Sequence, residues 1–207
     1  MKPKQLTKGS WSKSTQYFYS ILNQAPCWCE SILERDALLR LEFDSRVARY
    51  KAQPLSIQYT NAKGRIARYT PDHLLQFKDD NSYAFREVKV ASRVDEELLE
   101  KIWLINQEVK KTYGATLEII TDADIRRGYT VENLSRLYAY KRVVVSQAEV
   151  QTLLHALDHR FSFLQLTEQA RQMGARSVLP LALLAHGFLT FDMTAPLTAT
   201  TVVSKNA

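Results

Sequence analysis

The run YAFREVKV at residues 83–90 decides the fold, because its composition and spacing predict a strand that carries charge on one side. It follows a turn-forming segment, residues 78–82. On a strand, alternate side chains share a face, so Glu87 and Lys89 point the same way while Val88 turns into the sheet. A carboxylate and an ammonium group are thus displayed side by side. By itself such a pair is usually a surface salt bridge.

A second acid, Asp72, follows Pro71 upstream of this strand. If the segment before the turn pairs antiparallel with residues 83–90, Asp72 lies across from Glu87. Two carboxylates brought together repel each other unless something positive lies between them. Mg²⁺ does this with one or two protein oxygens, several waters and phosphate oxygens, and it activates a bound water. Lys89 would orient or help deprotonate that water, or offset charge on a scissile phosphate.

Glu34 is the third acidic candidate. Ser31 to Glu34 forms a capping-box pattern that opens a helix to about Phe43. Glu34 lies on the same helical stripe as Leu38 and Leu41, where an acid needs a partner. It could complete a metal site, or it could close the cap from Ser31, and the sequence leaves both interpretations open.

The neighbouring segments predict the rest of an α/β core. Helical periodicity, acids at the start and Gly114 at the end indicate a long helix at about 95–113. The order expected for this core is helix, three strands, helix, strand. Its strands are 54–59, 65–77 (paired with 54–59 through a turn at 61–64), 83–90 and 115–121.

Residues from about 146 onward predict a second unit. The expected elements are helices at 146–157, 167–173 and 177–186, then a hairpin of 188–193 with 197–204. Three helices plus a terminal hairpin is the outline of a winged helix. The helix that would enter a DNA groove, residues 178–184, has no base-reading side chains. This favours a packing or protein-contact role.

Composition describes an ordinary globular protein with a basic bias. The 207 residues include 45% hydrophobic and 24% charged residues, with a net charge of +6. No apolar run approaches membrane-spanning length and the N-terminus lacks a secretion signal, so we expect a cytoplasmic protein with no membrane partner. Cys27 and Cys29 are too close for an ordinary disulfide and are expected to be reduced. Trp28 and Trp103 are expected in the core.

The positive charge concentrates toward the N-terminal side. Residues 1–28 hold four lysines and no acid, and residues 45–71 hold basic residues and no carboxylate. Such a stretch could contact a phosphate backbone, or it could be a solvated surface. Lys63, Arg65 and Arg68 are the candidate DNA contacts, although strand alternation puts Arg65 and Arg68 on opposite faces. His155 and His159 have helical metal-ligand spacing but no third ligand, so an ordinary pair is favoured.

At this point the sequence resembles a known superfamily. Pro71-Asp72 followed by Glu87-Val88-Lys89 matches the PD-(D/E)xK signature of restriction-endonuclease-like nucleases. More narrowly, the sequence resembles the TnsA family, the endonuclease subunits of heteromeric bacterial transposases. The segments that carry this likeness are Ser31–Leu38 running into Leu41–Asp44, Gln53-Pro54, Tyr69–Asp72 and Glu87–Lys89.

The resemblance implies an α/β fold whose core is a mixed sheet flanked by helices, followed by a small winged-helix-like domain. The expected domains are a basic arm at 1–28, the PD-(D/E)xK nuclease at 29–142 and the winged-helix-like domain at 143–207. By position, Glu34, Asp72, Glu87 and Lys89 would be catalytic. Glu34, Asp72, Glu87 and Val88 would hold the metal.

The resemblance also implies an activity and partners. The protein would be an Mg²⁺-dependent DNA endonuclease, with Mn²⁺ as a substitute, that cuts the 5′ (non-transferred) strand of double-stranded DNA at transposon ends. Its partners would be the transposase TnsB and the ATPase TnsC, on the bacterial nucleoid, in a CRISPR-associated transposon. The alternatives are another PD-(D/E)xK repair or restriction nuclease, or a non-catalytic DNA-binding assembly adaptor.

Overall fold

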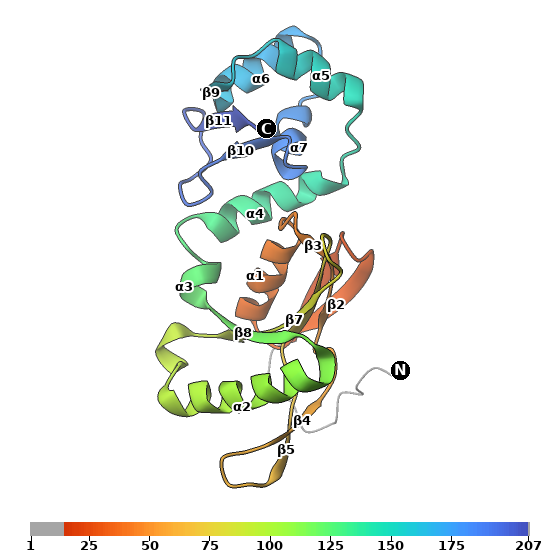
Figure 1. Ribbon diagram of the computed structural model, residues 1–207. Helices are drawn as coiled ribbons and strands as arrows, with labels where there is room; N and C mark the ends of the chain where they lie inside the picture. The colour runs from red at the N-terminus through yellow and green to blue at the C-terminus, as the bar shows by residue number, and fades with distance from the viewer. Residues whose placement is uncertain (1–14, 207) are drawn as a thin grey trace. The chain divides into compact units, whose positions relative to one another are not determined.

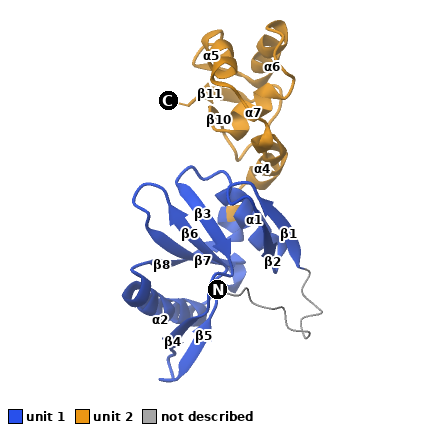
Figure 2. Cartoon of the chain, turned by 90° about the vertical axis from the view of Figure 1, so that its right-hand side faces the viewer, with its two compact units in different colours: residues 1–124 blue, residues 125–207 orange. Residues whose placement is uncertain are grey.

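The structure is a computed structural model that describes residues 15–206. The chain forms two compact units, residues 1–124 and residues 125–207 (Figure 2). This division falls earlier than the expected boundary at 142/143. The reason is that α4 (Thr130–Tyr138) and the 3-10 helix η2 (Ala139–Arg142) pack against α7 (Leu179–Ala185) of the second unit.

A four-stranded mixed sheet forms the centre of the first unit, in the order β3-β6-β7-β8 (Figure 1). The pairs β3–β6 and β6–β7 are antiparallel, whereas β7 and β8 are parallel and joined through a helix. A mixed sheet flanked by helices is compatible with the expected restriction-endonuclease-like core. The strands are β3 (Val47–Ala52), β6 (His73–Phe77), β7 (Tyr83–Lys89) and β8 (Thr116–Thr121).

Two helices flank this sheet at the positions that the sequence predicts. α2 (Glu96–Tyr113) begins after the N-cap Asp95 and ends at Gly114, whose φ of 61° is the left-handed conformation that glycine adopts readily. Its residues Ile102 and Ile105 pack against Phe85 and Leu117 on one face of the sheet. The other helix, α1 (Ile32–Leu41), contacts β7 and lies on the other side of the sheet from α2 (Figure 1).

The strand expected at 65–77 is interrupted, and this expectation was wrong in that respect. It forms two strands, β5 (Ile66–Tyr69) and β6, separated at Thr70–Asp72. Pro71 has no N–H to donate to a ladder, which favours a strand end there. β5 pairs with β4 (Ile57–Thr60) in a separate two-stranded hairpin whose inner face packs on α2.

Two features of the first unit were not predicted. β3 escaped notice because a register shift between Val47 and Arg49 breaks the alternation of buried and exposed residues. The described part of the expected arm forms a hairpin of β1 (Gln16–Ser20) and β2 (Ala25–Cys29), whereas residues 1–14 lie outside the described residues.

The two tryptophans expected in the core are exposed. Trp28 is 57% exposed and Trp103 is 59% exposed, so that prediction was wrong. Trp28 alternates with the buried Cys29 on β2 and therefore points outward. Trp103 follows Ile102 but lies off the buried stripe of α2. Cys27 and Cys29 are free cysteines, as expected.

The second unit contains three more helices and a three-stranded sheet. The strands pair in the order β10-β11-β9, all antiparallel. α5 and α6 each begin with a complete capping box, at Ser146 and Ser162. The elements after η2 are α5 (Gln147–His155), β9 (Arg160–Ser162), α6 (Phe163–Gln172), α7 (Leu179–Ala185), β10 (Leu189–Phe191) and β11 (Val202–Lys205).

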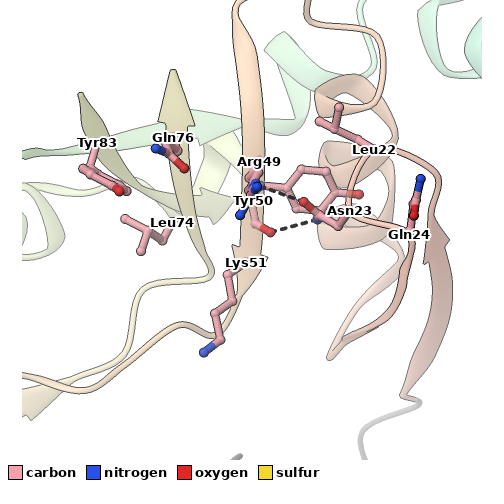
Figure 3. A pocket seen from close by; sticks show the side chains of 9 residues that line it. All are labelled: Leu22, Asn23, Gln24, Arg49, Tyr50, Lys51, Leu74, Gln76 and Tyr83. Atoms are coloured by element: carbon pink, nitrogen blue, oxygen red, sulfur yellow. Dashed lines mark hydrogen bonds between the residues drawn. The ribbon is translucent and has the colours of Figure 1, made fainter. Parts of the chain in front are cut away.

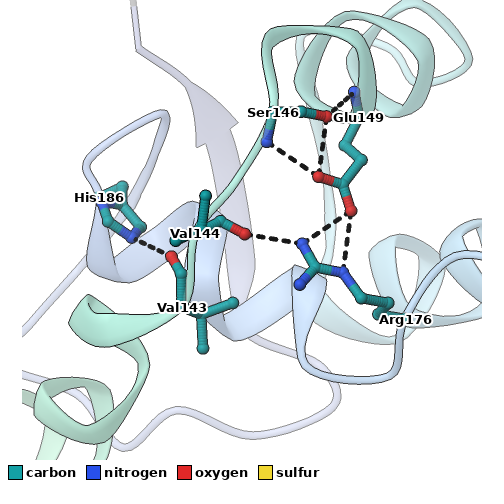
Figure 4. Close-up of polar contacts among 6 residues, drawn as sticks. All are labelled: Val143, Val144, Ser146, Glu149, Arg176 and His186. Carbon is teal, nitrogen blue, oxygen red and sulfur yellow. Dashed lines mark hydrogen bonds and ion pairs between the residues drawn. The ribbon is translucent and has the colours of Figure 1, made fainter.

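Polar contacts fix the segment that leads into α5 (Figure 4). Glu149 closes the capping box and also pairs with Arg176 at 2.7 Å. Arg176 donates a second hydrogen bond to the carbonyl of Val144 at 2.8 Å, and Nε2 of His186 lies 2.9 Å from the carbonyl of Val143. The segment before α5 is therefore held at Val143 by His186, directly after α7, and at Val144 by Arg176, in the loop before α7.

Across residues 15–206, we find no helix with both the length and the apolar character that crossing a membrane requires.

Gly128 is the position in the second unit where a side chain fits least. Its φ is +55°, and an added Cβ would lie 2.2 Å from the carbonyl oxygen of Thr194, which accepts a hydrogen bond from Tyr129. We expect Gly128→Ala to lower the free energy of unfolding by roughly 2–5 kcal/mol, through backbone strain and overpacking. Urea denaturation measures this.

The matched control is Gly174→Ala. Gly174 has a φ of +68° but no atom within 4 Å of an added Cβ. It should lose only about 1–2 kcal/mol, from the left-handed conformation alone. Equal losses in the two variants would show that the Thr194 carbonyl moves aside at little cost.

Candidate active site

The pairing of β6 with β7 brings Asp72 to Glu87. His73 is the register partner of Arg86, which places Asp72 opposite Glu87 at the start of β6. The backbone N–H of Val88 donates to Oδ2 of Asp72 at 2.8 Å. The position of Asp72 across from Glu87 was expected from the strand and turn pattern, whereas the Val88 contact was not, and this contact fixes the Asp72 carboxylate beside the end of β7.

Glu87 and Lys89 lie on one face of β7, as strand alternation predicts. Nζ of Lys89 forms an ion pair with Oε1 of Glu87, and the two side chains are 31% and 5% exposed. Val88 is buried on the opposite face. The ammonium group is therefore the member of this pair that solvent or a substrate reaches.

One oxygen of the buried pair has no partner. Oε2 of Glu87 is buried without a hydrogen bond, and the hydroxyl of Tyr69 is in the same state. Burial first, then the charge of Glu87 and a hydrogen-bonding interaction with it, raise the pKa of Tyr69, so the two groups are adjacent although their atoms lie outside good hydrogen-bond geometry. A buried carboxylate oxygen without a partner is energetically costly and is what a cation or water would satisfy.

The acids also perturb each other. The pKa of Asp72 is raised to about 7, first by burial and then by the charge of Glu87. The charge of Glu34 raises it further, whereas the Val88 N–H and Lys89 lower it. The site therefore has more negative charge than its own residues neutralise.

Glu34 performs the capping role that was one of its two interpretations. Its Oε2 accepts from the backbone N–H of Glu30 at 2.9 Å, and its Oε1 accepts from Oγ of Ser31 at 2.9 Å. The pKa of Asp72 still responds to its charge, as does that of Cys29, which burial and Glu34 raise to about 12. Glu34 thus borders the site while its carboxylate is engaged by the helix terminus.

Asp72 and Glu87 are the residues that could hold a divalent cation. Within the described residues, no group of three or more His, Cys, Asp or Glu side chains is arranged to hold a metal ion. Two carboxylates, one with an orphaned buried oxygen, nevertheless suit Mg²⁺, which takes few protein ligands and keeps its waters. The expected ligand Val88 contributes its N–H to Asp72, and its carbonyl lies 3.4 Å from Nζ of Lys89.

The three candidate DNA contacts lie on the β4–β5 hairpin. Asn61 orders its tip, because its Oδ1 accepts from the N–H groups of Lys63 and Arg65, both at 3.0 Å. Lys63, Arg65 and Arg68 are exposed, and they lie before the Thr70–Asp72 break. They belong to a different surface from the acids of β6 and β7.

Two residues of this site were not singled out as functional by the sequence. Tyr69 was within the motif that carries the resemblance, and alternation on β5 could have turned it toward α2, where Lys101 lies 4.7 Å over its ring. Cys29 had no such signal. It reaches the acids only because β2 lies beside α1, a long-range arrangement.

Fold and site together define a nuclease-like α/β domain. Residues 44–122 match the family model described as TnsA-like endonuclease N terminal. This segment is therefore similar to the N-terminal domain of TnsA-like endonucleases, and the match supports the expected TnsA-like protein. It contains Asp72, Glu87 and Lys89, whereas Glu34 lies outside it. Comparison with curated proteins gives no match.

A measurement of stability can test whether the Tyr69 hydroxyl lacks a strong hydrogen bond. We expect Tyr69→Phe to change the free energy of unfolding by less than about 1 kcal/mol, because only a weak interaction with Glu87, outside good hydrogen-bond geometry, is lost. The control is Tyr50→Phe, which removes a 2.5 Å bond to the buried Glu42 carboxylate. That variant should lose roughly 1.5–3 kcal/mol. Equal losses in urea denaturation would show that Tyr69 donates to Glu87.

Proposed function

We propose that this protein is a metal-dependent DNA endonuclease that cuts the 5′, non-transferred strand at transposon ends. The carrying observation is that Asp72, Glu87 and Lys89 converge within the segment that matches the TnsA-like endonuclease model. A nuclease of this kind acts in a transposase assembly on DNA. The partners in this proposal are TnsB, which would cut the 3′ ends, and TnsC.

The chemistry assigned to the site is phosphodiester hydrolysis. Asp72 and Glu87 would hold Mg²⁺ or Mn²⁺, which when bound lowers the pKa of a water and offsets charge on the phosphate. The Val88 N–H keeps Asp72 oriented toward Glu87. Lys89, the more exposed member of its ion pair, would turn its ammonium group to the scissile phosphate or to the attacking water. Glu34 would add negative charge beside Asp72 and is a candidate third acid.

The proposal extends to the surfaces around this site. Lys63, Arg65 and Arg68 would contact DNA phosphates from the ordered hairpin tip. Residues 143–207 would be a winged-helix-like domain, supported by the order α5, β9, α6, α7, β10, β11. α7 consists of apolar residues that are mostly buried, which favours a packing role over base reading. The proposal includes association with a CRISPR system, and the neighbouring genes would test that part of it.

Removal of either central acid should abolish cutting. We expect Asp72→Asn and Glu87→Gln each to slow 5′-strand cleavage at least about a hundredfold, because several kcal/mol of transition-state stabilisation would be lost. The measurement is strand-specific cleavage of labelled transposon-end DNA with Mg²⁺, TnsB and TnsC. Magnesium binding by calorimetry should fall in the same variants.

The control for this experiment is Asp79→Asn, an exposed acid in the turn before β7. It should cut and bind metal as the unmodified protein does. Cutting without TnsB would favour a repair or restriction nuclease. If Asp72→Asn cuts normally, the catalytic role of Asp72 is wrong. If the unmodified protein neither cuts nor binds Mg²⁺ or Mn²⁺, the assembly adaptor is favoured instead, in line with the lack of a three-ligand cluster among residues 15–206.

Glu34→Gln separates the two roles of that residue. Glutamine keeps one accepting oxygen for the contacts with the Glu30 N–H and the Ser31 hydroxyl, but it removes the charge next to Asp72. We therefore expect slower cleavage with only a small change in the midpoint of thermal unfolding. Unchanged cleavage would restrict Glu34 to capping α1.

A further inference from the structure

A groove opens over β3 and β6 (Figure 3). By strand alternation, this is the sheet face that also carries the acids. The groove has a volume of about 640 Å³. Its floor is formed by β3 and β6, where Arg49 pairs with Gln76 and Lys51 with Leu74. Directly opposed residues share a face, so all four side chains point into the groove. Tyr83 of β7, the register partner of Gln76, lies at its side and is 46% exposed.

The wall of the groove is the turn between β1 and β2, and it is fixed by partly buried hydrogen bonds. Asn23 bonds to the backbone of β3 through both polar atoms of its side chain. Its Nδ2 donates to the Tyr50 carbonyl at 2.8 Å, and its Oδ1 accepts from the Tyr50 N–H. The Glu42 carboxylate accepts from the N–H groups of Ile21 and Leu22 at 3.1 and 3.0 Å. The groove is therefore preformed.

The charge of the groove indicates the class of its ligand. Arg49 and Lys51 are exposed, and neither forms an ion pair among residues 15–206. No acid lines the groove, and its other polar side chains are neutral: the amides of Asn23, Gln24 and Gln76 and two tyrosines. Two uncompensated cations beside neutral donors suit a polyanion with phosphate groups.

The strand β6 connects the groove to the acids. Asp72, Leu74 and Gln76 alternate along the chain, so they lie on the same face. At two residues per roughly 7 Å, the groove begins about 7 Å from Asp72 and reaches about 13 Å from it. One DNA strand advances about 3.4 Å per nucleotide along the helix axis, so these distances correspond to about two to four nucleotides.

We infer that this groove binds the backbone of the DNA strand that enters the active site, with Arg49 and Lys51 on phosphates about two to four nucleotides from the cut. Tyr83 packs against a sugar or base of the same strand. The inference rests on the proposed function for the identity of the polyanion. It assigns to this groove a role separate from that of the β4–β5 hairpin.

The first test is the salt dependence of DNA binding. The double variant Arg49→Gln/Lys51→Gln should reduce the slope of log affinity against log salt by about 1.8, since each phosphate contact contributes about 0.9. Binding is measured by fluorescence anisotropy of a labelled transposon-end duplex in EDTA. The charge-retaining variant Arg49→Lys/Lys51→Arg should restore the slope, and thermal unfolding should be unchanged in both because the side chains are exposed.

The control removes equal charge from another surface. Lys110 and Lys111 are exposed in the last turn of α2, and Lys110→Gln/Lys111→Gln should leave the slope unchanged. Equal slopes in the groove variant and the unmodified protein would overturn the inference, as would equal losses in the groove and control variants. So would an unmodified protein that shows no DNA binding at low salt.

The second test locates the contact. Neutral methylphosphonate linkages are placed two to four nucleotides from the cut, first on its 5′ side and then on its 3′ side. On one of the two sides they should weaken binding by the unmodified protein but not by Arg49→Gln/Lys51→Gln. Equal weakening of both proteins would place the contact elsewhere.

The outcomes for the groove and for the proposed function are distinct. Groove-dependent binding without cleavage would contradict only the nuclease. Cleavage with an unchanged salt slope in the groove variant would contradict only the groove.

Discussion

Antiparallel pairing of β6 with β7 is the constraint on which the candidate active site depends. The register that joins His73 to Arg86 sets Asp72 opposite Glu87 and lets the Val88 N–H reach its carboxylate. A slip of one residue would turn every side chain of β6 to the other face. The buried Leu75, at the centre of β6, opposes such a slip because it would become exposed. Hydrophobic burial in the sheet thus fixes the position of the acids.

The acids themselves do not favour the fold. Asp72 and Glu87 repel each other in a buried place, which raises the pKa of Asp72, and one Glu87 oxygen has no hydrogen bond. Lys89 and the Val88 N–H offset only part of this repulsion. Buried charges that lower stability are typical of a functional site, because catalysis or binding requires groups that stability alone would not favour. The same arrangement explains why a cation suits this place.

The sequence alone predicted the structure correctly where local rules decide it. Alternation in residues 83–90 and the turn before them placed Glu87, Lys89 and Asp72, and the capping pattern placed Glu34. It was insufficient where long-range packing decides. The register shift hid β3, Pro71 ended a strand that periodicity continued, and nothing local brings Cys29 to the acids. Trp28 and Trp103 were expected in the core, although the periodicity of their own strand and helix turns them outward.

One helix links the acids to the groove. α1 has Glu34 in its first turn, beside Asp72, and Glu42 at its C-terminal cap, where it holds the turn that walls the groove. Its ten residues span about 15 Å, comparable to the length of β6 along the same sheet. Helix and strand therefore position both ends of one surface. Because both are packed on the same buried core, a bound strand would meet the groove and the acids in a fixed relation, which is what strand cutting at a defined phosphate requires.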